Sequence, residues 1–228
     1  MEAIVLAGGY GTRLKDVVPN VPKPMAKIGG RPFLEILLRS LESKGFERVI
    51  LSLGYLAEIV IQHFGPRFGS IDICYEVEKK PLGTGGALRA SLRNCIGEHV
   101  FVFNGDTFLD LEVDRVEALW IGNQNPVIVA RPVRDISRYS QLSIQGSRII
   151  NFMQKGGSGC GLINAGCYVL PKHFLDHYEV GFPFSLEEDF LPCYVQSNPV
   201  ELFVSDGYFI DIGIPEDYWR AQIELNHF

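Results

Sequence analysis

The chain has 228 residues, 46% of them hydrophobic, and it carries a formal net charge of −6. This length is enough to bury a sizeable core, and we expect one α/β domain spanning residues 1–228. The acidic balance argues against nucleic-acid binding, and the lack of a long apolar run or of a basic, apolar leader after Glu2 argues against a membrane-spanning or secreted protein, so we expect a cytoplasmic location.

Short apolar runs alternate with helical patterns through the first half of the chain. Leucines recur at helical spacing over residues 34–41, with Pro32 near the start and Gly45 after the end. Such alternation predicts a mainly parallel sheet sandwiched by helices, with ligands at the carboxyl ends of the strands. The expected strands are Ala3–Leu6, Val49–Leu53, Ile71–Val77 and Val100–Phe103.

The second half contains more strands and fewer helices. It has no internal repeat and no linker-like segment, so we expect it to continue the same domain and to form the other wall of a cleft. The expected strands are Val127–Ala130, Gln141–Ile144, Arg148–Phe152, Leu162–Leu170, Val200–Val204 and Tyr208–Ile210. The expected helices are Lys172–Tyr178, Leu186–Val195 and Pro215–Leu225.

A glycine-rich segment follows the first expected strand. Residues 6–14 read Leu-Ala-Gly-Gly-Tyr-Gly-Thr-Arg-Leu, and Pro22-Lys23-Pro24 comes soon after. Glycines let backbone N–H groups approach phosphate oxygens closely, although a glycine turn after a strand is often only a turn. The spacing matches neither the Walker loop nor the dinucleotide fingerprint. Residues 1–31 hold five basic and two acidic side chains in an otherwise acidic chain, which favours a polyphosphate site.

Two expected strands end in carboxylates. Asn104-Gly105-Asp106 follows one strand, and Asp211 follows another. A single strand-end aspartate is more often a turn former or helix cap, but a pair at the same sheet edge fits Mg²⁺, which prefers oxygen ligands. We interpret Glu216 and Asp217 as favourable acids at a helix N-terminus.

A second glycine-rich corner, Pro81-Leu82-Gly83-Thr84-Gly85-Gly86-Ala87, follows Glu78. Here a flat ring could lie against bare backbone while a carboxylate accepts hydrogen bonds from the ring's edge. The glycines could equally serve only the conformation of the loop. Asn164 and Glu187 are similarly open, because each could cap an element or bind a ligand.

These motifs, in this order, resemble those of the sugar-nucleotide nucleotidyltransferases, and the resemblance covers nearly the whole chain. It implies a three-layer α/β/α, Rossmann-like nucleotidyltransferase fold with a mixed, mainly parallel central sheet. It also implies a Mg²⁺-dependent reaction of a nucleoside triphosphate with a sugar 1-phosphate, giving a nucleotide sugar and pyrophosphate. A homodimer is possible.

The resemblance also implies roles for individual residues. Two departures from the family pattern, Gln154-Lys155-Gly156 and Ile214, leave Lys155 in place. Catalytic roles are implied for Arg13, Lys23, Asp106 and Asp211, the last two as Mg²⁺ ligands. Nucleotide contacts are implied for Leu6, Gly8, Gly9, Gly11, Thr12, Arg13, Lys23, Glu78, Gly83, Thr84 and Asp106, and sugar-phosphate contacts for Lys155, Asn164 and Glu187.

Within the family, Glu78 and the segment 81–86 resemble the guanylyl-transferring members that act on manno-configured sugars. The compact length and the segment Val21-Pro22-Lys23-Pro24-Met25 also resemble the bacterial members that act on D-glycero-alpha-D-manno-heptose 1-phosphate. The expected substrates are therefore GTP and this heptose 1-phosphate, with a role in building surface polysaccharides. Mannose 1-phosphate, or another pairing of nucleotide and sugar, is the alternative. A catalytically silent module that senses nucleotide sugars is the alternative from another class, but the basic and acidic motif positions all persist.

Overall fold

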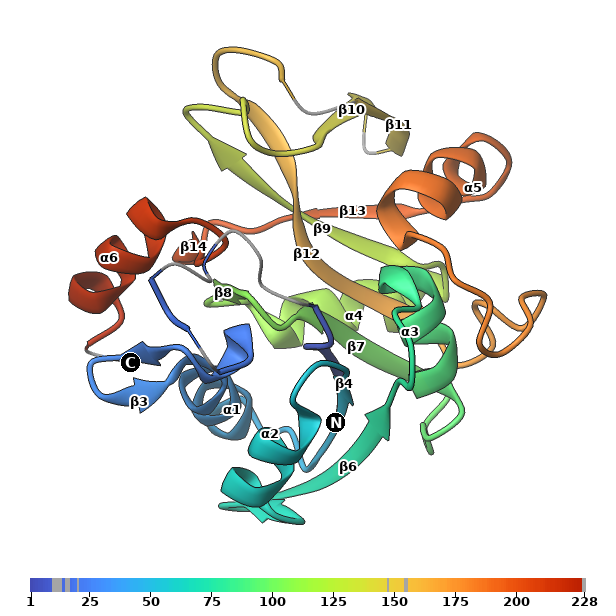
Figure 1. Cartoon of the computed structure of the whole chain (residues 1–228). Coiled ribbons are helices and arrows are strands. Elements are labelled where there is room, and N and C mark those ends of the chain that lie inside the picture. Colours follow the sequence, from blue (N-terminus) through green and yellow to red (C-terminus); the bar gives the residue numbers. More distant parts are fainter. Residues whose placement is uncertain (10–13, 15–16, 20, 147, 154–155, 227–228) are drawn as a thin grey trace.

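The computed structural model describes residues 1–228 except 10–13, 15–16, 20, 147, 154–155 and 227–228. A 10-stranded sheet runs through the molecule (Figure 1). Its strands are β1 (Glu2–Leu6), β4 (Arg48–Leu53), β5 (Arg67–Phe68), β6 (Ile71–Val77), β7 (His99–Asn104), β9 (Val127–Val133), β10 (Gln141–Gln145), β11 (Arg148–Met153), β12 (Gly161–Pro171) and β13 (Glu201–Val204). The order across the sheet is β10-β11-β13-β9-β12-β7-β1-β4-β6-β5.

Short ribbons and helices complete the fold. The two-stranded ribbons are β2 (Lys27–Ile28) with β3 (Arg31–Pro32), and β8 (Thr107–Leu109) with β14 (Phe209–Asp211). The helices are α1 (Phe33–Ser43), α2 (Ala57–Phe64), α3 (Gly83–Leu92), α4 (Val113–Asn123), α5 (Leu191–Ser197) and α6 (Pro215–Glu224), with a 3-10 turn η2 (Lys23–Met25) and a π-helical turn η3 (Leu186–Phe190). No described helix is long and apolar enough to cross a bilayer.

The sheet is mixed, as expected. In the first half of the chain, β1 is parallel to both β4 and β7, and β4 is parallel to β6. In the second half, β12 runs antiparallel to both β7 and β9, while β9 and β13 are parallel. Mainly parallel pairing therefore holds for the first half, and the insertion of β12 in the opposite direction makes the second half mostly antiparallel.

Both faces of the sheet are covered, which explains the apolar runs in its central strands. In β1, Ala3 and Val5 belong to a core cluster shared with α1, α2 and α4, whereas Ile4 belongs to a cluster shared with α3, η3 and α5. Successive strand residues point to opposite faces, so a strand buried on both sides is apolar throughout. The result is the three-layer α/β/α arrangement that the sequence predicts (Figure 1).

A third core cluster holds helix α6 against α1 and the β8–β14 ribbon. Phe108 of β8, Ile210 of β14, Phe33 of α1 and Tyr218 of α6 are among its buried members. The segment after β7 and the segment before α6 are thereby fixed beside each other.

One expected helix is wrong, and one is divided. Residues 172–178 form successive turns, in which Phe174 N bonds to Pro171 O and Asp176 N bonds to His173 O, instead of a continuous helical ladder. The expected helix at Leu186–Val195 begins as η3 and becomes α5 at Leu191. The other expected elements are present, with ends shifted by a few residues at most.

Candidate functional site

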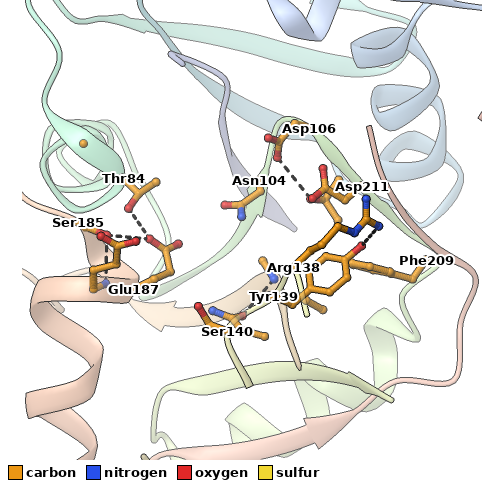
Figure 2. A pocket seen from close by; sticks show the side chains of 16 residues that line it. Thr84, Asn104, Asp106, Arg138, Tyr139, Ser140, Ser185, Glu187, Phe209 and Asp211 are labelled. Atoms are coloured by element: carbon orange, nitrogen blue, oxygen red, sulfur yellow. Dashed lines mark hydrogen bonds between the residues drawn. The ribbon is translucent and has the colours of Figure 1, made fainter. Parts of the chain in front are cut away.

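Two adjoining pockets lie at the carboxyl ends of β1 and β7. The larger has a volume of about 420 Å³, and the smaller has a volume of about 170 Å³. Three residues, Thr84, Asn104 and Asp106, line both pockets. The smaller pocket adds Leu6, Gly9 and Lys23, and the larger adds Gly83, Asn164, Glu187 and Asp211 (Figure 2). Residues expected at the nucleotide and at the sugar therefore meet around Asp106.

The β8–β14 ribbon brings the two expected metal ligands together. Thr107, which follows Asp106, pairs with Asp211 across the ribbon. Ile212 N also donates a hydrogen bond to the Asp106 carbonyl oxygen at 2.9 Å. Figure 2 shows the Asp106 and Asp211 side chains on the same side of the larger pocket.

Lys23 supplies a cation to this acidic pair. Its Nζ lies 2.5 Å from Asp106 Oδ2, and its side chain is only 10% exposed, against 37% for Asp106. Lys23 is the first residue of η2, and it lines the smaller pocket together with Leu6 and Gly9 of the glycine-rich segment. A largely buried ammonium at a pocket wall can offset charge on a phosphate as well as on Asp106.

Close packing around Asp211 explains why a glycine stands at position 213. Gly213 N donates a hydrogen bond to Asp211 Oδ1 at 2.6 Å. A Cβ at Gly213 would lie 2.7 Å from that oxygen and 3.3 Å from Lys23 Nζ. Any larger residue would displace the carboxylate or the ammonium.

Asp106 and Asp211 fit a divalent cation that is shared with a substrate. Among the described residues, no group of three or more His, Cys, Asp or Glu side chains could hold a metal ion by itself. Mg²⁺, however, is commonly held by one or two carboxylates together with substrate phosphates. The donor set is therefore that of a substrate-assisted magnesium site and not of a closed protein cage.

Glu187 is held by three hydroxyl groups, from α3, from β12 and from the residue before η3. Thr84 Oγ1 donates to its Oε2 at 2.5 Å (Figure 2). Tyr168 OH donates to its Oε1 at 3.1 Å. Ser185 Oγ also bonds to Oε2, at 3.4 Å. Asn164 Nδ2 donates to the Tyr168 oxygen at 2.7 Å. The two expected sugar-site residues, Asn164 and Glu187, are thus joined through Tyr168.

Sequence reasoning missed Tyr168. The side chain is fully buried, and burial together with the nearby charge of Glu187 raises the pKa of its hydroxyl well above its ordinary value. It therefore stays neutral and keeps the proton that it donates to Glu187. The sequence does hold one sign of this role: Tyr168 is a hydroxyl-bearing residue in the otherwise apolar run that follows Asn164-Ala165-Gly166.

The second glycine-rich corner is shaped by packing at the start of α3. The N–H groups of Gly85 and Gly86 both donate to the carbonyl oxygen of Phe184, at 3.0 Å and 3.3 Å. A Cβ at Gly85 would lie 2.2 Å from the Phe184 ring, and one at Gly83 would lie 2.4 Å from the Phe184 carbonyl oxygen. The absence of side chains at these glycines lets the segment around Phe184 pack against the start of α3. This packing brings Glu187, in the following η3 turn, close to Thr84.

Glu78 lies at a third pocket, of about 140 Å³, together with Gly8, Gly54 and Pro81. Its Oε2 accepts a hydrogen bond from Leu82 N at 3.0 Å. Its Oε1 approaches the bare backbone so closely that a Cβ at Gly8 would lie 2.7 Å away. Burial raises the pKa of Glu78, and the bond from Leu82 partly opposes that shift. The carboxylate therefore sits against the glycine-rich segment and not in open solvent.

Four of the expected site residues, Gly11, Thr12, Arg13 and Lys155, lie outside the described residues. The larger pocket also includes Arg138, which sequence reasoning did not single out. Its only signal was a basic residue in a loop between two expected strands of the second half.

Comparison with known proteins gives consistent likenesses. The family model described as nucleotidyl transferase matches residues 2–227. The chain is 40% identical, over the full length of both proteins, to D-glycero-alpha-D-manno-heptose 1-phosphate guanylyltransferase of Aneurinibacillus thermoaerophilus. It is 38% identical to the enzyme of the same name from Campylobacter jejuni, over 98% of this chain and 99% of that protein.

Solved structures agree. The crystal structure of HddC from Yersinia pseudotuberculosis superposes with a TM-score of 0.89 at 37% identity, covering 98% of each chain. A second structure of HddC, complexed with GMP-PN, superposes with a TM-score of 0.87. The fold class expected from the sequence is thereby confirmed.

Proposed function

The chain belongs to the nucleotidyl transferase family, and we propose that it transfers GMP from GTP to D-glycero-alpha-D-manno-heptose 1-phosphate in the cytoplasm. The products are a GDP-sugar for surface polysaccharides and pyrophosphate. The observation that carries the proposal is the pair of adjoining pockets that share Asp106, with Lys23 at one and Glu187 at the other. The names of the two relatives at 40% and 38% identity support this acceptor, and the GMP-PN complex of HddC supports the guanine nucleotide.

The chemistry needs positioning more than an activated nucleophile. A sugar 1-phosphate is already an anionic oxygen nucleophile near neutral pH, so neither an activated serine nor a histidine base is required. One of its phosphate oxygens attacks the α-phosphorus of GTP, and the bond from that phosphorus to the oxygen bridging to the β-phosphate breaks. Pyrophosphate leaves with the electron pair. The protein holds two mutually repelling anions in line and offsets the charge that develops.

The smaller pocket is the proposed triphosphate site. Leu6, Gly9 and Lys23 line it, and the Lys23 ammonium is bonded to Asp106. An ammonium has three donors, so Lys23 can bond to a phosphate oxygen while keeping Asp106 as a partner. By the family resemblance, Gly11, Thr12 and Arg13 complete the triphosphate contacts.

Asp106 and Asp211 are the proposed Mg²⁺ ligands. Bound there with the substrate phosphates, Mg²⁺ would offset negative charge on the α-phosphate and on the departing pyrophosphate. The β8–β14 pairing holds the backbone beside both carboxylates, Lys23 bonds to the carboxylate of Asp106, and the Gly213 N–H group bonds to that of Asp211, so each carboxylate has a protein partner before the substrate arrives.

The larger pocket is the proposed sugar site. Glu187 and Asn164 offer carboxylate and amide groups that suit sugar hydroxyls, and their mutual bonding through Tyr168 fixes their orientation before the sugar arrives. By the family resemblance, Lys155 meets the sugar phosphate.

Glu78 is the proposed reader of the base. Guanine presents its N1–H and exocyclic amino group side by side, and one ionised carboxylate can accept from both. Uracil and thymine place carbonyl oxygens beside their single ring N–H, which would face the carboxylate unfavourably. The position of Glu78 against Gly8 places this carboxylate next to the glycine-rich segment.

A matrix of pyrophosphate-release assays tests the function. GTP, UTP, CTP and dTTP are each paired with heptose, mannose and glucose 1-phosphates in the presence of Mg²⁺. We expect the highest kcat/KM for GTP with the heptose. A preference for mannose 1-phosphate with GTP would replace the acceptor but keep the guanylyl transfer, and no release from any pairing would leave the silent sensing module as the better description.

A further inference from the structure

The larger pocket is strongly acidic. Four carboxylate side chains line it, those of Asp106, Asp211, Glu187 and Glu188. Among the described residues of its lining, Arg138 is the only one with a basic side chain. A phosphomonoester carries close to two negative charges at neutral pH, so its entry into such a pocket needs a cation that is already in place.

Arg138 is held by a buried acid on the C-terminal helix. Its Nη2 lies 2.6 Å from Asp217 Oδ2, and the Asp217 side chain is only 6% exposed. Nη2 also donates to Tyr139 OH at 3.2 Å, and the guanidinium carbon lies 5.4 Å from the centre of the Tyr139 ring. The Arg138 side chain is nevertheless 42% exposed. One nitrogen of the guanidinium is thus anchored by Asp217 and Tyr139 while the side chain stays accessible. Figure 2 shows the bond to Tyr139.

Asp217 has a second cation. Arg220 Nη1 lies 3.1 Å from Asp217 Oδ1, on the oxygen that Arg138 does not use. If Arg138 turns part of its guanidinium towards a ligand, the buried carboxylate therefore stays compensated. This matters because a buried charge that loses its partner is strongly destabilising.

We propose that Arg138 binds the phosphate of the sugar 1-phosphate and that Asp217 is its positioning residue. Arginine suits this task because its rigid fork of N–H donors can engage one anion while other donors hold a second. Asp217 lies in the first turn of α6, so it does more than favour the helix N-terminus: it ties this helix to the loop that forms the pocket wall. The inference rests on the proposed use of a sugar 1-phosphate and adds two residues to its site.

Arg138→Met is the main test, because it removes the charge and keeps much of the side-chain length. Arg134→Met is the matched control, since Arg134 is an exposed arginine of the same loop and does not line the pocket. With saturating GTP, we expect KM for the sugar 1-phosphate to rise about 10- to 100-fold in Arg138→Met, the loss typical of a charge-assisted hydrogen bond. KM for GTP should not change, and Arg134→Met should match the wild type in both constants.

Asp217 is tested by a double-mutant cycle. Asp217→Asn should raise the same KM by a smaller factor, and adding it to Arg138→Met should change that KM little further, because both act through one guanidinium. Melting temperatures of all variants separate loss of fold from loss of binding. If Arg138→Met is folded and keeps the wild-type KM for the sugar 1-phosphate, the assignment is wrong.

A binding measurement separates this inference from the proposed function. Calorimetric titration with mannose 1-phosphate alone measures phosphate recognition without turnover. If the wild type releases no pyrophosphate from GTP but binds mannose 1-phosphate more tightly than Arg138→Met does, guanylyl transfer fails and the Arg138 site stands. Equal affinities, or no binding by the wild type, would overturn the Arg138 site.

Discussion

The ammonium of Lys23 lies 2.5 Å from Asp106 Oδ2, although 83 positions separate the two residues in the chain. One partner comes from η2 beside the glycine-rich segment, and the other follows β7. Asp106 lines both pockets, and Lys23 lines the smaller one. A nucleotide bound on one side and a sugar phosphate bound on the other would therefore meet at the same pair of charges.

The first prediction concerns the proposed metal ligands. Asp106→Asn and Asp211→Asn should each lower kcat by ~10²–10³, the usual loss when one group that stabilises transition-state charge is removed. Both variants should fold, because the β8–β14 backbone pairing does not use the carboxylates. Asp114→Asn, an exposed position on α4, is the control and should keep full activity. Mg²⁺ titrations of kcat in a folded variant test the assignment, and an unchanged curve would contradict it.

The second prediction concerns Tyr168, which links the two proposed sugar-binding residues. Tyr168→Phe removes the hydroxyl bonded to Glu187 and leaves Asn164 Nδ2 without that partner. We expect KM for the sugar 1-phosphate to rise while KM for GTP is unchanged. The free energy of unfolding should fall by about 0.5–1.5 kcal/mol for each lost hydrogen bond, because Asn164 and Glu187 are half-buried at the pocket, where water can replace the hydroxyl. Tyr194→Phe, at a ring that stacks on Phe190 outside the pocket, is the control for loss of a tyrosine hydroxyl. Equal effects on both KM values would show a general packing defect instead.

The parts of the fold that could be predicted are those set by local pattern. Strand β1 is apolar from Ala3 to Leu6 because both of its faces are buried, and the sequence shows this directly. The placement of β12 between β7 and β9 depends on pairing between distant segments, which no local pattern encodes. The expected helix at 172–178 fails for a related reason: Phe174 and Leu175 are both buried in a turn, and their hydrophobicity does not distinguish a turn from a helix.

The site divides in the same way. Asp106 could be proposed from sequence because it follows a strand in the parallel half of the sheet. Asp211 can be proposed on the same ground, but the structure brings it to Asp106 through the antiparallel β8–β14 ribbon and not at the edge of the main sheet. The partners of the buried side chains could not be proposed from sequence. The Arg138–Asp217 and Tyr168–Glu187 contacts join separate parts of the chain at spacings that belong to no motif. The glycine motifs can be recognised in the sequence, but the contacts that require glycine at these positions cannot. Gly85 is required by the Phe184 ring, a contact that only the folded chain reveals.

The third prediction concerns Gly213. A methyl group there would lie 2.7 Å from Asp211 Oδ1, so Gly213→Ala should push the carboxylate out of place and lower kcat, with little change in melting temperature. Gly122→Ala is the matched control, because nothing lies within 4 Å of its Cβ position in α4. Alanine is favoured over glycine in a helix by roughly 0.5–1 kcal/mol, so this control should be slightly more stable and fully active. Wild-type kcat in Gly213→Ala would show that the Asp211 position tolerates displacement.

The fourth prediction is base selectivity. A bidentate contact from Glu78 to guanine, together with the unpaired groups that a wrong base leaves, is worth roughly 1–3 kcal/mol. Glu78→Gln should therefore lower the preference for GTP over UTP and dTTP by about 5- to 150-fold. Glu76→Gln is a nearby control, since Glu76 bonds to Asn94 and does not line the Glu78 pocket. Assays with paired, competing triphosphates measure the ratio directly, and an unchanged ratio in Glu78→Gln would remove this residue from the base site.

The last prediction is the pH dependence that follows from the same carboxylate. Burial raises the pKa of Glu78, so the group takes up its proton at a higher pH than an exposed glutamate does. Only the ionised form accepts two hydrogen bonds from guanine, so KM for GTP should rise as the pH falls through this raised pKa. Glu78→Gln should not show this rise in KM.

The free energy of unfolding should change with pH in the opposite sense, because the protonated form of Glu78 favours the folded state. Because the folded-state pKa exceeds the unfolded one, the contribution of Glu78 to the free energy of unfolding is present below the unfolded pKa and is lost as the pH rises through the folded pKa. Measuring KM for GTP and denaturant unfolding across this range, in the wild type and in Glu78→Gln, tests both signs. A pH profile of KM that is identical in the two proteins would show that guanine does not contact this carboxylate.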